Sequence, residues 1–558
     1  MLELNSKLKK AIVFSLIINS VLAFSGFYAR TYDSYGHMFF ADHYRRTWFD
    51  IWEPKWYTGF NIASYPPLAH QAIALLSFVT GLEIAYTIIT ILLMILLPIG
   101  VFKFSKVFVS KEAAGYASIL SVFLPGIFLS VYVWGQFTTL FSLVFVLFAI
   151  PSFNQYLRKG SLFHFIEAIF LFEAVIAAHH FSGLFFFPFL LLATFVFELF
   201  QKELKFKKIF KRLLLFLIIG FSLSLLVIYP VLFIASGQNI HIPHPSTLNY
   251  FLNLDLLKLF FFEMFGFFLL FIPLTIIVVR HHRNLLPLFL LATFFLILGL
   301  GGTTPLPQIV FGDNWLGLTY DRFNLFSGLS VMPILGLVCF ELNRKKNGKK
   351  FFLFFLVLSI LFASWVGNYS IFRPRPKEVP IDPIVRFLDS NEHWKWRYLT
   401  LGFGSYDFCR LSILSNATTL DGWYYRGRVI PELADSGVGQ LFTAKYEENG
   451  MSVLRSVLEN ASHYHLRFVF CNDLYYESIL NETGFRLLDE SYEQVTIWVK
   501  EDSPELEMNE IVKTDHVPTL LDYSWGIIPI VWLIGVFFFV IVWGFRNREK
   551  ILHAFSTE

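Results

Sequence analysis

Segment 31–68, TYDSYGHMFFADHYRRTWFDIWEPKWYTGFNIASYPPL, is polar and aromatic although long apolar runs flank it. Within it Asp33 and His37 are four residues apart, so in a helix the two side chains would share one face. A carboxylate beside apolar segments is costly, and it can serve as a general base that accepts the proton of an attacking hydroxyl. It can equally cap the start of a helix. Position alone leaves both interpretations open.

Polar side chains also stand at the ends of apolar runs further along the chain. Gln136 follows Trp134 between two such runs, and Asp321 and Arg322 open another. A guanidinium binds phosphoryl oxygens in a bidentate manner, so Arg322 suits a phosphate group. The alternatives are that Arg322 pairs with Asp321 or reaches toward lipid headgroups.

Four more histidines stand at the ends of apolar runs: His179, His180, His241 and His244. With His37 they could in principle assemble a zinc site, but no ligand spacing demands one, so we predict no metal centre. Hydrogen bonding to phosphate or sugar is the functional interpretation, and for each single histidine an interfacial residue without a role is the alternative. The sequence leaves open whether a divalent cation is needed.

The composition decides which kind of protein must position these residues. Of 558 residues 55% are hydrophobic and 16% are charged, and the mean hydropathy is +0.57. Soluble domains are about one-quarter charged, so we predict a polytopic α-helical membrane protein. The formal net charge of +3 is too small to suggest a nucleic-acid partner.

Apolar segments long enough to cross the bilayer as helices recur along the chain. We expect twelve spans, near residues 11–29, 83–102, 113–131, 138–155, 162–178, 181–200, 213–235, 256–279, 285–300, 322–342, 351–368 and 525–545. The segment LAHQAIALLSFVTG, residues 68–81, is too short for a full span, and we expect an outer-face or re-entrant helix there.

Basic clusters such as KELKFKKIFKR and NRKKNGKK alternate with short loops that, outside residues 30–66, are nearly free of Lys and Arg. The positive-inside rule therefore predicts a multi-pass plasma-membrane protein with cytoplasmic N- and C-termini. Residues 30–66 then form the first outer loop. Its aromatics Trp48, Trp52, Trp56 and Tyr57 suit sugar stacking, although interfacial aromatic belts are the ordinary explanation.

The chain divides by composition into residues 1–368, which carry the spans and the first outer loop, residues 369–524, and a final helix with its tail at 525–558. The middle part alternates strand-like segments, WRYLTLGF, LRFVFCND and EQVTIWVK, with helical ones, DPIVRFLDS and YEENGMSVLRSVLEN. We predict a C-terminal extracytoplasmic α/β domain before the last span. Its stretch LDGWYYRGR, residues 420–428, is a candidate acceptor contact or simply a turn and strand.

Several motifs together carry a family resemblance: DSYGHMFF (33–40), WEPKWYTGF (52–60), YPPL (65–68), WGQFTTL (134–140), AAHHFSGL (177–184), YDRF (320–323) and LDGWYYRGR (420–428). The chain resembles the GT-C superfamily of integral membrane glycosyltransferases, which use lipid-phosphate-linked sugars. Within it the resemblance is to prokaryotic membrane proteins labelled "6-pyruvoyl-tetrahydropterin synthase related", a label that we do not take as chemistry. The resemblance implies Asp33 as the catalytic base. The chain lacks the adjacent acidic pair of many members, and Asp42 is the nearest second acid.

These observations lead to one main functional hypothesis. We expect an inverting transfer of a sugar from a polyprenyl-phosphate donor to a glycan, glycolipid or protein acceptor at the outer membrane face. Asp33 is the expected base, and we expect the substrates to be bound by the remaining candidates: His37, Asp42, Gln136, His179, His180, His241, His244 and Arg322. The alternatives are a transporter or flippase of lipid-linked saccharides and a non-catalytic membrane scaffold.

Overall fold

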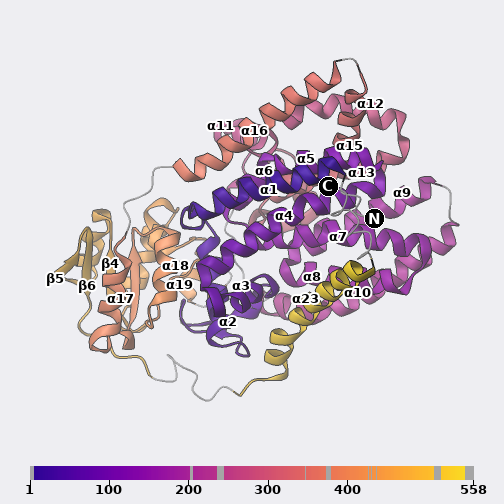
Figure 1. Ribbon diagram of the computed structural model, residues 1–558. Coiled ribbons are helices and arrows are strands. Elements are labelled where there is room, and N and C mark those ends of the chain that lie inside the picture. The colour runs from indigo at the N-terminus through magenta and orange to yellow at the C-terminus, as the bar shows by residue number, and fades with distance from the viewer. Residues whose placement is uncertain are drawn as a thin grey trace.

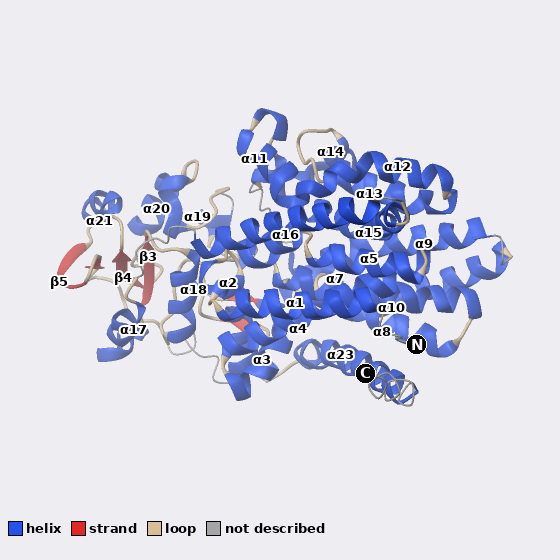
Figure 2. Ribbon diagram, turned by 45° about the horizontal axis from the view of Figure 1, so that its top comes forward, coloured by secondary structure: helices blue, strands red, loops and turns tan. Residues whose placement is uncertain are grey.

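The structure is a computed structural model that describes residues 5–201, 205–235, 244–345, 347–372, 379–424, 427–428, 430–434, 436–507 and 517–546. Long apolar helices dominate it, and strands β3 to β6, between residues 397 and 499, lie together at one end of the molecule (Figure 1, Figure 2). The membrane domain contains the helices α1 (Ser6–Phe24), α4 (Leu82–Phe108), α5 (Lys111–Val122), α7 (Phe137–Lys159), α8 (Leu162–Ala178), α9 (Phe187–Gln201), α10 (Phe206–Ala235), α13 (Leu286–Leu298), α15 (Asp321–Asn343) and α16 (Gly348–Phe372).

Further helices complete this domain: α2 (Ser34–Arg46), α3 (Leu68–Thr80), α6 (Pro125–Phe128), α11 (Leu254–Lys258), α12 (Ile272–His281) and α14 (Leu306–Phe311). The last helix, α23 (Leu520–Arg546), packs back onto α8. The chain thus returns to the membrane domain after leaving it.

Each of the twelve predicted spans contains helix, but not every helix is long and apolar enough to cross a bilayer. Among the described residues eight are, or nine if the pair Lys111–Val122 and Pro125–Trp134, bent by 46°, forms one span. Helix α1 carries three lysines near its start, and α8 has only 17 residues. The chain is therefore a multi-pass membrane protein, and the count of twelve stays a prediction.

A four-stranded mixed sheet forms the centre of the C-terminal domain, by which we mean the described residues between 379 and 507. Its order is β3-β4-β6-β5, with β3 (Arg397–Leu401) parallel to β4 (Leu466–Cys471). Both β4 and β5 (Arg486–Tyr492) pair antiparallel with β6 (Val495–Val499). Its helices are α17 (Ile381–Asp389), α18 (Ser405–Leu414), α19 (Pro431–Ala434), α20 (Gly450–Glu459) and α21 (Glu477–Glu482).

Strands β3, β4 and β6 and helices α17 and α20 lie where the sequence pattern predicts them. Strand β5 was missed because it is an edge strand with mostly exposed, charged residues and no apolar alternation. The predicted domain boundaries at 368/369 and 524/525 fall inside α16 and α23.

The long crossover from β3 to β4 carries α18, which packs against α2 of the membrane domain (Figure 1). Between α2 and α3 the first loop forms a short antiparallel hairpin of β1 (Trp52–Glu53) and β2 (Phe60–Asn61). Trp56 stacks on Phe39 with ring centroids 3.6 Å apart, and its indole nitrogen donates to Ser412 Oγ at 2.9 Å.

Trp56 and Tyr57 are completely buried in this contact. For these two residues both sequence interpretations, a sugar platform and an interfacial belt, are therefore wrong. They join the first loop to the C-terminal domain.

Candidate functional site

A cavity of about 890 Å³ lies where the helix ends of the membrane domain, the first loop and the C-terminal domain meet. Seven of the residues singled out in the sequence line it: Asp33, His37, Gln136, His179, His180, His244 and Arg322. They come from segments far apart in the chain, and the fold brings them into one cavity. His241 lies outside the described residues, and Asp42 does not line the cavity.

The turn Val133–Gln136 fixes the position of Asp33. The backbone amides of Tyr32 and Asp33 donate to the carbonyls of Val133 and Trp134, at 3.2 and 2.9 Å. Gly135 permits this approach because its φ is +74° and because a Cβ there would lie 2.9 Å from the Ser34 nitrogen. The structure therefore explains why glycine stands in the middle of the motif WGQ.

The side chain of Asp33 faces the cavity. Asp33 is the N-cap residue of α2, yet its carboxylate accepts no capping hydrogen bond. The capping interpretation therefore has no support. Burial raises the pKa of Asp33 to about 7, because Arg322 offsets this effect only in part and Asp321 adds to it. A carboxyl group with such a pKa can exchange protons near neutral pH.

Arg322 lies in the first turn of α15, with its guanidinium carbon 5.9 Å from the centroid of the Phe181 ring. Among the described residues it forms no ion pair, and its buried Nε has no hydrogen-bond partner. Asp321 instead accepts a hydrogen bond from Gln136 Nε2 at 3.1 Å. The sequence alternative that Arg322 pairs with Asp321 is therefore wrong, and its charge remains available to an anion in the cavity.

Three cavity histidines have one ring nitrogen engaged by a neighbouring side chain. His37 Nδ1 lies 3.0 Å from His70 Nε2, His179 Nδ1 lies 2.8 Å from Ser182 Oγ, and His244 Nδ1 lies 2.7 Å from Ser246 Oγ. Burial, followed by the charge of Arg322, lowers the pKa of His37 to about 3 and that of His179 well below its usual value. These imidazoles are neutral at pH 7, and each keeps a second nitrogen for a ligand.

The described residues contain no group of three or more His, Cys, Asp or Glu side chains arranged to hold a metal ion. The cavity histidines are instead tied to partners within the protein. Their arrangement suits hydrogen bonding to oxygen atoms of a ligand.

The cavity also has lining residues that the sequence did not single out. Arg30 is one of them. The sequence could have predicted it as a site residue, because it is a basic residue in a predicted outer loop, three positions before Asp33. Asp407 and Glu447 line the cavity from the C-terminal domain. Trp423 lines it as well, and it belongs to the stretch LDGWYYRGR, the candidate acceptor contact predicted from the sequence. No local pattern could find Asp407 and Glu447, because tertiary contacts, among them the packing of α18 on α2, bring that domain to the cavity.

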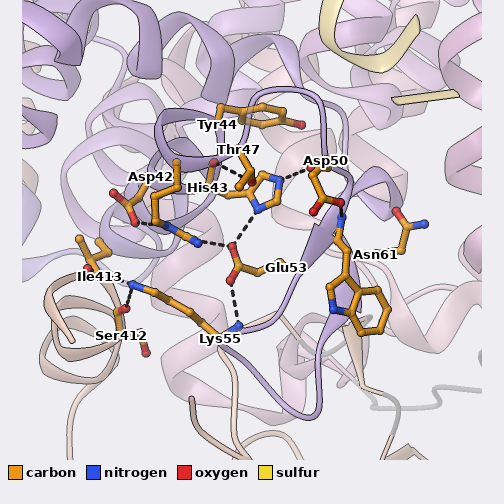
Figure 3. A network of polar contacts seen from close by, with 12 residues as sticks. Asp42, His43, Tyr44, Thr47, Asp50, Glu53, Lys55, Asn61, Ser412 and Ile413 are labelled. Atoms are coloured by element: carbon orange, nitrogen blue, oxygen red, sulfur yellow. Dashed lines mark hydrogen bonds and ion pairs between the residues drawn. The ribbon is translucent and has the colours of Figure 1, made fainter. Parts of the chain in front are cut away.

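Asp42 belongs to a separate network of polar contacts within the first loop (Figure 3). Arg46 Nε donates to Asp42 Oδ2 at 2.9 Å, and Arg45 lies 3.7 Å from the same carboxylate. Because its charge is paired there and it does not reach the cavity, we exclude Asp42 from the site proposed below.

Glu53 is the centre of this network (Figure 3). Its completely buried carboxylate lies 2.9 Å from His43 Nδ1 and 2.6 Å from Arg46 Nη2. Although burial raises the pKa of Glu53, Arg46 and His43 hold it below its usual range. Lys55 Nζ donates to the carbonyls of Ser412 and Ile413 at the end of α18, at 2.8 and 3.2 Å. The network thereby ties the first loop to the C-terminal domain.

Solved structures with a similar fold are membrane glycosyltransferases. The oligosaccharyltransferase of Archaeoglobus fulgidus in its apo form matches 92% of this chain with 77% of its own, at 12% identity and a TM-score of 0.54. ArnT from Cupriavidus metallidurans in the apo state matches 88% with 98% of its own, at 10% identity and a TM-score of 0.53. The chain has the GT-C glycosyltransferase fold.

A third solved structure with the GT-C fold is also similar to this chain. The arabinofuranosyltransferase AftD from mycobacteria matches 88% of this chain with 40% of its own, at 11% identity and a TM-score of 0.53. No family model and no curated protein matches the sequence. The comparison establishes the fold, and the reaction has to be inferred from the site. The narrower resemblance to the "6-pyruvoyl-tetrahydropterin synthase related" proteins stays a prediction.

Proposed function

We propose that the chain is a membrane glycosyltransferase that moves a sugar from a polyprenyl-phosphate-linked donor to an acceptor hydroxyl at the outer membrane face. One observation carries this proposal: the carboxylate of Asp33 and the unpaired guanidinium of Arg322 line the same cavity. A sugar hydroxyl is a poor nucleophile and needs a base, and a departing phosphate needs positive charge. The cavity offers both.

The proposed reaction is a single displacement. Asp33 takes the proton of the acceptor hydroxyl while the hydroxyl oxygen forms a bond to the anomeric carbon of the donor sugar. The bond from that carbon to the phosphate oxygen breaks, and the phosphate leaves with the electron pair. Its new negative charge develops beside Arg322, which stabilises the transition state. The anomeric configuration is inverted.

Further features of the cavity support an anionic donor. Arg30 is a second guanidinium on the lining, and the first residues of α7 and α15 lie next to Gln136 and Arg322. The start of a helix carries partial positive charge, which favours a phosphate. The ArnT structure bound to undecaprenyl phosphate, with a TM-score of 0.53, shows that a protein of similar fold accommodates such a lipid.

Substitution of Asp33 tests the proposal. Asp33→Asn keeps the size of the side chain but cannot accept the proton, so sugar transfer from a polyprenyl-phosphate donor should fall about 10²- to 10⁴-fold. Undecaprenyl phosphate should still bind. The control is Asp42→Asn, the same substitution outside the cavity, which should retain most of the transfer rate.

The assay uses the purified full-length protein in detergent, and size-exclusion profiles confirm that both variants are folded. Transfer by Asp33→Asn at near the parental rate would refute the proposed role of the base. Loss of transfer in Asp42→Asn alone would place the base elsewhere in the first loop.

A further inference from the structure

The two walls of the cavity differ in charge. Among the described lining residues there are two arginines, Arg30 and Arg322, and both come from the membrane domain. Of the three carboxylates that the described residues contribute, Asp407 and Glu447 come from the C-terminal domain, and Asp33 is the third. A phosphate is therefore attracted to the membrane-domain wall. An acceptor that approaches along the C-terminal domain meets the carboxylate of Glu447, which repels an anion.

Trp423 is half-buried and has the largest ring among the aromatic residues that the C-terminal domain contributes to the cavity wall, which also include Tyr406, Tyr424, Phe442 and Tyr446. One side of its indole packs on Gly36 of α2, where a Cβ would lie 2.6 to 3.0 Å from three atoms of the six-membered ring. Glycine inside a helix costs about 1 kcal/mol relative to alanine, and here this close packing accounts for it. The indole thus lies one helical turn after Asp33.

The loop that carries Trp423 is firmly anchored on both sides. The buried carboxylate of Asp421 accepts hydrogen bonds from the amides of Gly422 and Phe442, each at 2.8 Å. Tyr57 of the first loop donates to the Tyr424 carbonyl at 3.0 Å, and the Tyr424 hydroxyl donates to the carbonyl of Ser64 at 3.0 Å. Trp423 is therefore held in place before any ligand arrives, which lowers the entropic cost of binding.

Polar groups surround the indole on this wall. Gln440 lines the cavity and donates to the carbonyl of Trp423 at 3.4 Å, which leaves its side-chain oxygen to accept other hydrogen bonds. The half-buried carboxylate of Glu447 follows on the same segment. An aromatic surface flanked by hydrogen-bond acceptors matches a sugar ring, which presents C–H groups on one face and hydroxyl donors around its edge.

We propose that Trp423, Gln440 and Glu447 form an acceptor subsite for an uncharged sugar ring, so that the acceptor is a neutral glycan or glycolipid. The ring stacks on the exposed part of the indole, its peripheral hydroxyls donate to Gln440 and Glu447, and one hydroxyl reaches Asp33. The inference rests on the proposed function and narrows it. It selects neutral glycosides over anionic ones.

Saturation-transfer-difference NMR on the full-length protein in detergent tests the subsite without any need for turnover. The probes are the methyl glycosides of glucose, galactose, mannose and arabinose, with methyl glucuronide as the anionic counterpart of methyl glucoside. At least one neutral glycoside should bind, and its affinity should fall about tenfold in Trp423→Ala, as expected for the loss of one stacking contact. Methyl glucuronide should bind more weakly than methyl glucoside in the wild type.

Two further variants make the result specific. Trp394→Ala removes a tryptophan that packs against the sheet of the same domain and does not line the cavity, so it should leave glycoside binding unchanged. Arg322→Ala should weaken binding of undecaprenyl phosphate and keep the glycoside, whereas Trp423→Ala should do the reverse.

The subsite is refuted if the wild type binds none of the neutral glycosides, if Trp423→Ala binds them as the wild type does, or if methyl glucuronide binds best. Failure of the wild type to bind undecaprenyl phosphate, with glycoside binding dependent on Trp423, would instead overturn the donor half of the proposed function. The two failures are therefore distinguishable.

Discussion

Asp33 and Asp42 show how surroundings decide what a carboxylate can do. Both lie in the same 38-residue polar segment, nine positions apart. Asp42 is bound by Arg46 at 2.9 Å, whereas Asp33 faces the cavity without a capping hydrogen bond. Burial raises the pKa of Asp33, and the network around Asp42 gives that residue a structural role. Because both residues are aspartates, residue type alone could not tell which of the two has a structural role.

The pKa of Asp33 leads to a prediction for pH dependence. Because burial raises this pKa to about 7 and the base must be ionised, activity should be present above pH 7 and lost as the pH falls through it. We expect kcat/KM for the acceptor to fall about tenfold per pH unit below 7 and to level off above it. The measurement is the transfer rate from pH 5.5 to 8.5.

A return to pH 8 must restore the rate, which controls for acid denaturation. A profile that is flat down to pH 5.5 would contradict the prediction, because it is the behaviour of a carboxylate with the usual pKa near 4.

At the residue scale, much of the candidate site could be predicted from the sequence. Histidine, glutamine and arginine at the ends of apolar runs are costly unless they share an aqueous site, and this rule found Gln136, His179 and Arg322. It failed for Asp407 and Glu447, because acidic residues are ordinary on the surface of a soluble domain. Only tertiary packing places them in the cavity.

At the scale of elements, the site depends on turns that bring helix ends together. The turn at Gly135 connects to α7, accepts two backbone hydrogen bonds from the segment before α2, and holds Asp33 in place. The bond from Gln136 to Asp321 then joins the start of α7 to the start of α15, where Arg322 lies. The base and the cation are thus positioned by the same turn.

Gly135→Ala tests this positioning. The new Cβ would lie 2.9 Å from the Ser34 nitrogen and Oγ and from Thr31 Oγ1, so the segment that carries Asp33 must shift. A displacement of about 1 Å at a reacting group can cost about 10² in rate. We therefore expect kcat to fall about 100-fold while the protein still expresses and binds undecaprenyl phosphate.

Gly26→Ala is the matched control. Gly26 has nearly the same φ, +73°, but no atom lies within 4 Å of its added Cβ. Both substitutions carry the same backbone strain, of about 1 kcal/mol, and only Gly135→Ala also carries the clash. Equal losses of activity in the two variants would show that backbone strain, and not the position of Asp33, matters.

The sequence predicted most elements well and failed where periodicity is absent. Apolar runs located the membrane helices, and β3, β4 and β6 are buried strands rich in apolar residues. Edge strand β5 lacks this signal. The hairpin of the first loop was also missed, because each of its strands has two residues, too few to show any alternation.

For the whole molecule, the decisive feature is that the C-terminal domain and the cavity lie on the same side. Ser405 Oγ donates to the carbonyl of Tyr32 at 3.2 Å, and Lys55 reaches the end of α18. Helix α9 follows His180 of the cavity and ends at Gln201, so Lys207 and Lys208 in the first turn of α10 lie about one helix length away from the cavity. Because the C-terminal domain lines the cavity, the side of the membrane on which this domain lies is also the side on which the site lies.

Cysteine labelling in intact cells should decide this orientation. Glu459 is exposed in α20 of the C-terminal domain, and Lys207 is exposed at the start of α10. The positive-inside rule predicts that Glu459→Cys reacts with a membrane-impermeant maleimide in intact cells and that Lys207→Cys reacts only after permeabilisation. Background labelling by the native cysteines should be low, because Cys339, Cys409 and Cys471 are all buried.

The reverse labelling pattern would put the cavity on the cytoplasmic side, so the donor phosphate would have to be presented from the inner leaflet. Labelling of both positions in intact cells would mean that the variants disturb insertion, and a protease-protection assay on the wild type would then distinguish the two orientations.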